Sequence, residues 1–82
     1  MKNVKIYDNG GKTFDRYTAV YMNCPTDHNQ AYFDARGMDA RPFHPQGFGQ
    51  FTIACPGKHL GKRIKFEDLP VDCQKLIQED IR

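Results

Sequence analysis

The 82-residue chain contains no serine and no tryptophan, and its longest apolar stretches are only a few residues long. The lack of serine excludes catalysis by a serine nucleophile. The short apolar stretches exclude a membrane-spanning helix, which needs about 20 consecutive apolar residues. Residues 1–3 lead straight into a strand-like pattern, without the apolar region of a secretory signal. We therefore expect a soluble, cytoplasmic protein that has no membrane partner.

Cysteine is also scarce, with three residues in the whole chain. A secreted domain stapled by disulfides usually has a larger, even number of cysteines, so we expect reduced thiols. The hydrophobic content of 39% and the charged content of 27% are ordinary for a folded protein and argue against disorder. A chain of this length forms one small domain, residues 1–82, with a modest core.

Alternating apolar and polar residues predict several short strands. Asp8-Asn9-Gly10-Gly11 is typical of a hairpin turn, because Asn and Gly tolerate positive φ. β-branched and aromatic residues are frequent on both sides of this turn. The expected strands cover residues 3–8, 13–22, 31–36, 48–55 and 63–66, and charged residues mark the last one as an edge strand.

The last segment predicts a helix over residues 70–81. Pro70 suits the first helical position, where its missing N–H has no partner to lose. Cys73 is followed by Leu76, Ile77 and Ile81 at spacings of three, four and eight, which form one apolar stripe. The predicted fold class is therefore α+β: an antiparallel sheet of four to five strands over about residues 3–66, with one C-terminal helix packed on one face.

Two Cys-Pro-x-x-His turns provide a candidate metal site. Cys24 and His28 form the first pair, and Cys55 and His59 form the second. Thiolate and imidazole are zinc ligands, and two such pairs would supply the four ligands of a tetrahedral site. The alternatives are that these residues are ordinary loop and core residues, or that the thiols have a redox or disulfide role. Cys73 belongs to the helical stripe and is expected in the core.

The net charge of +2 is distributed unevenly. Residues 58–65 contain four Lys or Arg and no acid, whereas residues 66–82 contain five acids and two bases. A basic loop punctuated by Gly57 and Gly61 can gather N–H groups and ammonium groups around a phosphate. With exposed tyrosines from the sheet it would form a platform for nucleic acid, and the candidates are Tyr7, Tyr17, Tyr21 and Tyr32. The alternative is a solvated loop whose charge the acidic segment neutralises.

Two further features bear on function. Arg16 follows Asp15 on the predicted second strand and points to the opposite face, so we expect Arg16 to pair with a carboxylate on a neighbouring strand. Residues 42–50 form a stiff loop with two prolines and two glycines, of a kind that often carries function. His44 in this loop, or His59, would be the acid/base group of an enzyme. No complete catalytic set accompanies either histidine, which favours a protein that is not an enzyme.

Four segments together resemble a small family of uncharacterised proteins encoded by phages and prophages, a family without an established activity. The segments are Tyr7–Thr18, Pro45–Gln50, His59–Ile64 and Asp68–Pro70. The resemblance implies that the three loop regions form one surface. It also implies a protein that binds a host component or nucleic acid, and it disfavours catalysis.

The leading hypothesis is thus a small, non-enzymatic binding module that contacts a host protein or nucleic acid. The candidate binding residues lie in the turn at residues 8–12 and its neighbourhood, in the loop at 42–50 and in the loop at 57–65: Asn9, Gly10, Gly11, Lys12, Arg16, His44, Gln46, Gln50, Lys58, His59, Lys62 and Arg63. The first rival is a zinc-stabilised protein with the Cys2His2 site, and the second is an acid/base enzyme. We expect a monomer or a homodimer and no cofactor other than zinc.

Overall fold

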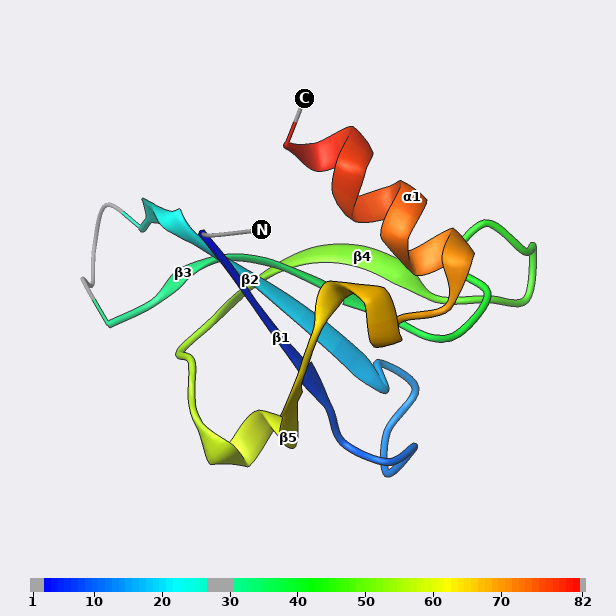
Figure 1. Cartoon of the computed structure of the whole chain (residues 1–82), viewed down its shortest axis with the longest axis horizontal. Helices are drawn as coiled ribbons and strands as arrows, with labels where there is room; N and C mark the ends of the chain where they lie inside the picture. Colours follow the sequence, from blue (N-terminus) through cyan, green and yellow to red (C-terminus); the bar gives the residue numbers. More distant parts are fainter. Residues whose placement is uncertain (1–2, 27–30, 82) are drawn as a thin grey trace.

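The computed structural model describes residues 3–26 and 31–81 and has an α+β fold (Figure 1). One helix, α1 (Val71–Asp80), packs on a five-stranded antiparallel sheet. The strands are β1 (Val4–Asp8), β2 (Tyr17–Pro25), β3 (Phe33–Met38), β4 (Gly49–Ala54) and β5 (Lys62–Ile64), and two short 3-10 helices are η1 (Lys58–Leu60) and η2 (Phe66–Asp68). This architecture confirms the predicted fold class.

The spatial order of the strands is β4-β3-β2-β1-β5, so β4 and β5 occupy opposite edges of the sheet. The connection between them therefore has to cross three strands (Figure 1). It crosses the face opposite α1, where Leu60 of η1 packs against a buried cluster that includes Tyr7 and Val20. The crossing brings the basic segment that follows η1 next to β1, where β5 pairs antiparallel with residues 6–8.

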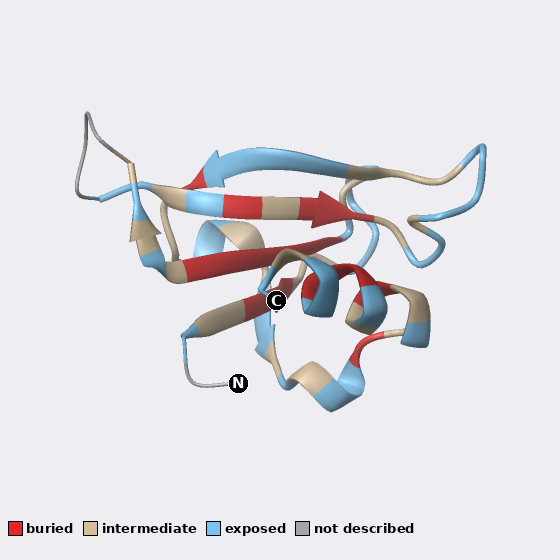
Figure 2. Ribbon diagram, turned by 90° about the horizontal axis from the view of Figure 1, so that it is seen from above, coloured by how far each residue is buried: buried red, intermediate tan, exposed pale blue. Residues whose placement is uncertain are grey.

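The main core lies between α1 and the sheet. Cys73, Leu76 and Ile77 of α1 are buried against strand residues such as Ile6 and Ala19. Figure 2 shows the inner side of α1 and much of β2 as buried. The predicted helical stripe is confirmed for these three residues, whereas Ile81 follows the end of α1 and is 48% exposed.

A smaller core lies on the other face, beneath the β4–β5 connection, and contains Tyr7 and Val20. Because both faces are covered, Tyr7, Tyr17 and Tyr21 are 4%, 7% and 4% exposed. The expectation that these three tyrosines present their rings to solvent is therefore wrong. Of the four candidate tyrosines only Tyr32 is exposed.

Several boundaries differ from the prediction. β2 begins at Tyr17, four residues later than expected, because the side chains of Asp8 and Asn9 hydrogen-bond the following backbone and hold it in a loop. β5 ends at Ile64 and not at residue 66. Pro70 is the N-cap and Val71 the first helical residue. The β1–β2 hairpin and the edge position of β5 are as predicted.

Candidate functional site

Two of the predicted functional loops meet at the end of β1. A depression of about 400 Å³ lies between the β1–β2 loop and the segment that runs from η1 into β5. We call it the basic depression; its lining residues are Asp8, Asn9, Gly10, Lys12, Lys58, His59, Gly61 and Lys62. The sequence places these two segments about 50 residues apart, and the β1–β5 pairing joins them.

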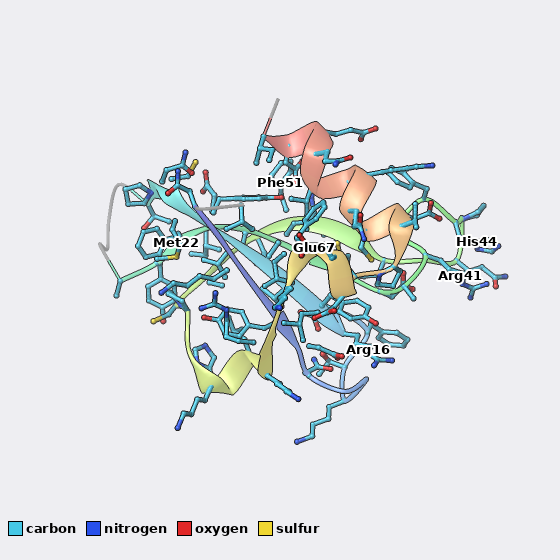
Figure 3. The ribbon with its side chains drawn as sticks, viewed as in Figure 1. Arg16, Met22, Arg41, His44, Phe51 and Glu67 are labelled. Atoms are coloured by element: carbon cyan, nitrogen blue, oxygen red, sulfur yellow. The ribbon has the colours of Figure 1, made fainter. Side chains whose placement is uncertain are left out.

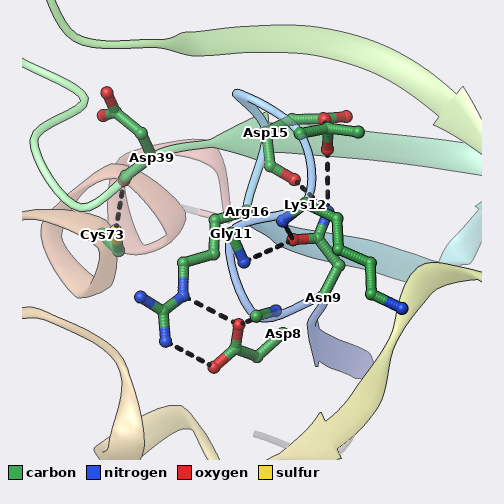
Figure 4. Close-up of polar contacts among 10 residues, drawn as sticks. Asp8, Asn9, Gly11, Lys12, Asp15, Arg16, Asp39 and Cys73 are labelled. Carbon is green, nitrogen blue, oxygen red and sulfur yellow. Dashed lines mark hydrogen bonds and ion pairs between the residues drawn. The ribbon is translucent and has the colours of Figure 1, made fainter.

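The β1–β2 loop is held by side-chain caps on its own backbone (Figure 4). Asp8 Oδ1 accepts the N–H of Gly10 at 2.8 Å. Asn9 Oδ1 accepts the N–H groups of Gly11 and Lys12 at 2.8 and 3.0 Å. Gly10 and Gly11 take positive φ values of 79° and 87°, which only glycine adopts without strain. The caps therefore fix where the Lys12 side chain leaves the loop.

Gly61 lets the second segment approach this loop closely. Its φ is +113°, and a Cβ built on it would lie 2.3 Å from the carbonyl oxygen of Asp8. No side chain fits at that distance, so glycine is required for η1 and β5 to approach the end of β1. The N–H of Gly61 also donates to the carbonyl of Lys58 at 3.0 Å and closes η1.

The charge of the depression is positive because its acid is already paired. Arg16 donates from Nε to Asp8 Oδ1 at 2.9 Å and from Nη2 to Asp8 Oδ2 at 3.2 Å (Figure 4). This bidentate pair holds the pKa of the Asp8 carboxyl below its ordinary value. It also confirms the prediction that Arg16 pairs with a carboxylate on a neighbouring strand.

The lysines of the depression have no such partner among the described residues. Within residues 3–26 and 31–81, only Arg16–Asp8 and Arg36–Asp80 form ion pairs within 4.0 Å. Lys12, Lys58 and Lys62 are all exposed. Three unpaired ammonium groups thus surround a depression whose single carboxylate is neutralised, and an anion would be attracted to it.

The other predicted binding residues lie around the depression or away from it. Gly11 adjoins it in the β1–β2 loop, and Arg16 contributes by pairing Asp8. Arg63 lies on β5 with its guanidinium 5.6 Å from the centre of the Tyr7 ring. Because Tyr7 belongs to the core on the face opposite α1, Arg63 extends the positive charge onto that face.

The loop at residues 42–50 does not line the basic depression. Figure 3 shows Arg41 and His44 at the end of the molecule away from η1. His44 Nδ1 accepts the N–H of Gln46 at 3.1 Å, so that nitrogen serves a local turn. Gln46 and Gln50 are exposed. The surface expected from three loops is therefore built from two of them, because this loop joins β3 to β4 at the other side of the sheet.

Phe14 is a feature that the sequence did not reveal. It lies in the β1–β2 loop, two residues after Lys12, and is 86% exposed. The pattern of residues 13–22 predicts a strand, which hid Phe14 among residues expected to pack. Phe14 and the unpaired Lys12 line a shallow hollow beside the basic depression, so the β1–β2 loop presents an aromatic ring and a positive charge together.

The predicted zinc site involves His28, which lies outside the described residues. Among the described residues, no group of three or more His, Cys, Asp or Glu is placed to hold a metal ion. Cys24 packs against the helix-side core, and His59 lines the basic depression. The four-ligand site of Cys24, His28, Cys55 and His59 stays a prediction.

Cys73 is a core residue, as expected. It is fully buried, and its thiol donates to the carbonyl of Asp39 at 3.0 Å (Figure 4). Burial raises the pKa of the thiol to about 12. A protonated, inaccessible thiol of this kind has a packing role and no nucleophilic one.

Comparisons of the chain with protein-family models, with curated proteins and with solved structures found no significant match. Within the described part of the chain, no helix has the length and apolar character needed to cross a membrane.

Proposed function

We propose that the protein is a non-enzymatic binding module and that its basic depression binds the phosphates of nucleic acid. The observation that carries this proposal is the convergence of Lys12, Lys58 and Lys62 around a carboxylate that Arg16 already neutralises. Neutralising phosphate charge with lysine releases counterions from nucleic acid, which is the main source of affinity for such surfaces.

Phe14 favours a single-stranded partner. Proteins that bind single strands combine a basic groove with exposed aromatic rings on which bases stack. Stacking on one ring typically contributes about 1–3 kcal/mol. A duplex presents no free base faces, so Phe14 would add nothing to duplex binding. We infer that single-stranded DNA or RNA binds more tightly than a duplex of the same sequence.

A binding site on a host protein is the other form of this hypothesis. An acidic protein surface would also attract the three lysines, and an apolar pocket on it would accept Phe14, so direct binding of oligonucleotides is what separates the two forms. His44 and His59 belong to different loops, and only His59 lines the depression, so the geometry does not support a shared acid/base site. The proposal therefore rests on the lysines and Phe14.

Fluorescence anisotropy with labelled oligonucleotides tests the proposal. Single-stranded and duplex oligomers of one sequence are titrated at several salt concentrations. We expect Lys12→Gln and Lys62→Gln each to weaken binding and to lower the slope of log K against log salt by about 0.7 for single strands. Phe14→Ala should weaken single-strand binding by roughly 5- to 150-fold and leave duplex binding unchanged.

Lys75→Gln provides the matched control, because Lys75 is exposed on α1 and outside the depression. It removes the same charge from the protein without touching the site. The proposal fails if no oligomer binds at low salt. It also fails if Lys75→Gln lowers the salt slope as much as Lys12→Gln does, since binding would then follow net charge alone.

A further inference from the structure

β4 is an edge strand that lacks the features which usually keep edge strands from pairing with another chain. Within the described residues, no strand pairs with its outer side. None of its six residues is charged and none is proline. Natural edge strands usually carry charge, proline or a bulge, because their free N–H and C=O groups otherwise pair with another strand. β5, at the opposite edge, has Lys62 and Arg63 at two of its three positions.

The exposed side chains of β4 are large and apolar. Phe51 and Ile53 share the face on which α1 lies, yet they are 65% and 56% exposed because α1 covers the neighbouring strands (Figures 2 and 3). Ile81, just after α1, is 48% exposed and lines the same hollow as Phe51. Three large apolar side chains are thus exposed near this edge of the sheet, and exposed apolar surface gathered on a small domain marks an interaction surface.

We propose that β4 pairs in antiparallel orientation with β4 of a second copy of this chain. The pairing places a twofold axis at Thr52 and joins two sheets into one continuous sheet. Opposite residues of an antiparallel pair lie on the same face. This register places Phe51 opposite Ile53 of the partner subunit and Ile53 opposite Phe51 of the partner subunit. Aromatic and β-branched residues are favourable cross-strand partners, and so are two threonines at the axis.

A second copy of this chain is the partner that suits β4. A twofold interface requires a patch that complements itself, and the uncharged sequence of β4 brings no like charges together. The same pairing of β5 about its central residue would set Arg63 opposite Arg63 of the partner subunit, which brings two like charges together. Phe51 and Ile53 of both copies would bury on the order of 400 Å² of apolar surface, about a third of a small stable interface. The backbone ladder and the flanking residues supply the remaining contact.

The proposed dimer is compatible with the basic depression. β1 and β5, which border the depression, lie at the far side of the sheet from β4. Pairing through β4 therefore leaves both depressions open at the two ends of the joined sheet. Two sites on one rigid assembly would increase the affinity for a strand long enough to reach both.

Sedimentation velocity of the full chain over a range of concentrations tests the pairing. Ile53→Lys is the variant of choice, because Asp34 lies opposite Ile53 on β3 and accommodates an ammonium group within the monomer. We expect a dimer for the wild type and a folded monomer for Ile53→Lys. Val71→Lys is the matched control, since Val71 is 63% exposed on α1, and it should remain a dimer.

A second variant tests the register. Phe51→Glu places its carboxylate opposite Arg36 on β3, which Asp80 already pairs, so circular dichroism has to verify that this variant is folded. Phe51→Glu alone should be monomeric. Mixing it with Ile53→Lys should restore a mixed dimer, because the two new charges face each other in the proposed register. A wild type that stays monomeric up to about 1 mM overturns the proposal, and so does a dimer that survives Ile53→Lys or a mixture that stays monomeric.

Discussion

Arg36 of β3 and Asp80 of α1 form a bidentate ion pair, with Nε 2.9 Å from Oδ2 and Nη2 2.5 Å from Oδ1. Their side chains are only 12% and 7% exposed. The hydroxyl of Tyr21 on β2 donates to the same carboxylate. An acid at the C-terminal end of a helix is unfavourable for the helix dipole, and the buried arginine offsets that cost. The pair thus ties the last turn of α1 to the middle of the sheet.

Asp80→Asn is expected to lower the free energy of unfolding by about 3–5 kcal/mol, because it leaves the largely buried Arg36 guanidinium without a counter-charge. Urea unfolding followed by circular dichroism measures the change. Asp72→Asn is the control: Asp72 lies near the N-terminus of α1 and forms no ion pair among the described residues, so its loss should cost less than about 1 kcal/mol. Equal effects of the two variants would contradict the anchoring role of Asp80.

Gly61→Ala is expected to disrupt the basic depression. The substituted residue would face both a positive φ and a backbone oxygen at 2.3 Å, so η1 has to move away from β1. We expect a loss of stability of about 2–4 kcal/mol and weaker oligonucleotide binding. Gly10→Ala separates the two causes, because Gly10 also has positive φ but has nothing within 4 Å of the place that the added methyl group would occupy. It should cost about 1 kcal/mol, and a larger effect than that of Gly61→Ala would contradict the close approach.

The elements that could be predicted from the sequence are those that local patterns determine. The period of Cys73, Leu76 and Ile77 identified α1 and its buried side, and the Asp8–Gly11 turn identified the β1–β2 hairpin. Both depend on residues within a few positions of one another. The pairing of Arg16 with Asp8 was also predictable, because a hairpin brings the two strands together.

The features that could not be predicted depend on the order of strands in space. No local pattern shows that the chain crosses beneath the sheet after β4, and this crossing buries Tyr7 and places Lys58 and Lys62 next to Lys12. The same order separates the loop at 42–50 from that site. Phe14 was hidden because its aromatic side chain strengthens a strand pattern, while the caps from Asn9 hold the backbone in a loop.

The Asp8–Arg16 pair should make the free energy of unfolding depend on pH in the acidic range. The pKa of the Asp8 carboxyl lies below its ordinary value of 3.8, chiefly because Arg16 donates to it. A lowered pKa means that the ionised form stabilises the folded state above that ordinary value, and that this contribution is lost as the pH falls through the lower one. Asp8→Asn should therefore be less stable than the wild type at pH 6, by up to about 1 kcal/mol for this partly exposed pair. The difference should shrink below pH 3.8, and urea unfolding from pH 2.5 to 6 measures it.

Arg16→Gln tests the same pair from its other side and should remove the same part of the acid dependence. A difference between wild type and Asp8→Asn that persists unchanged at pH 2.5 would contradict the role of the ionised carboxylate. Neutralising Arg16 also releases the negative charge of Asp8 at the edge of the basic depression. Arg16→Gln should therefore weaken oligonucleotide binding at neutral pH, although Arg16 itself does not line the depression.

Cys73 should react with alkylating reagents only when the protein unfolds. Its thiol is fully buried, donates to the Asp39 carbonyl and has a pKa raised to about 12, chiefly by burial. Cys24 and Cys55 are half-buried and should react faster in the native protein. Iodoacetamide labelling followed by mass spectrometry resolves the three sites. In denaturant all three should react at similar rates, which controls for local sequence effects. Because the raised pKa favours the protonated thiol in the folded state, its contribution to stability is present below the ordinary pKa of 9.0 and is lost as the pH rises above it. Native labelling of Cys73 as fast as Cys55 would show that α1 opens locally without global unfolding, and it would contradict the packing of α1 as the main core.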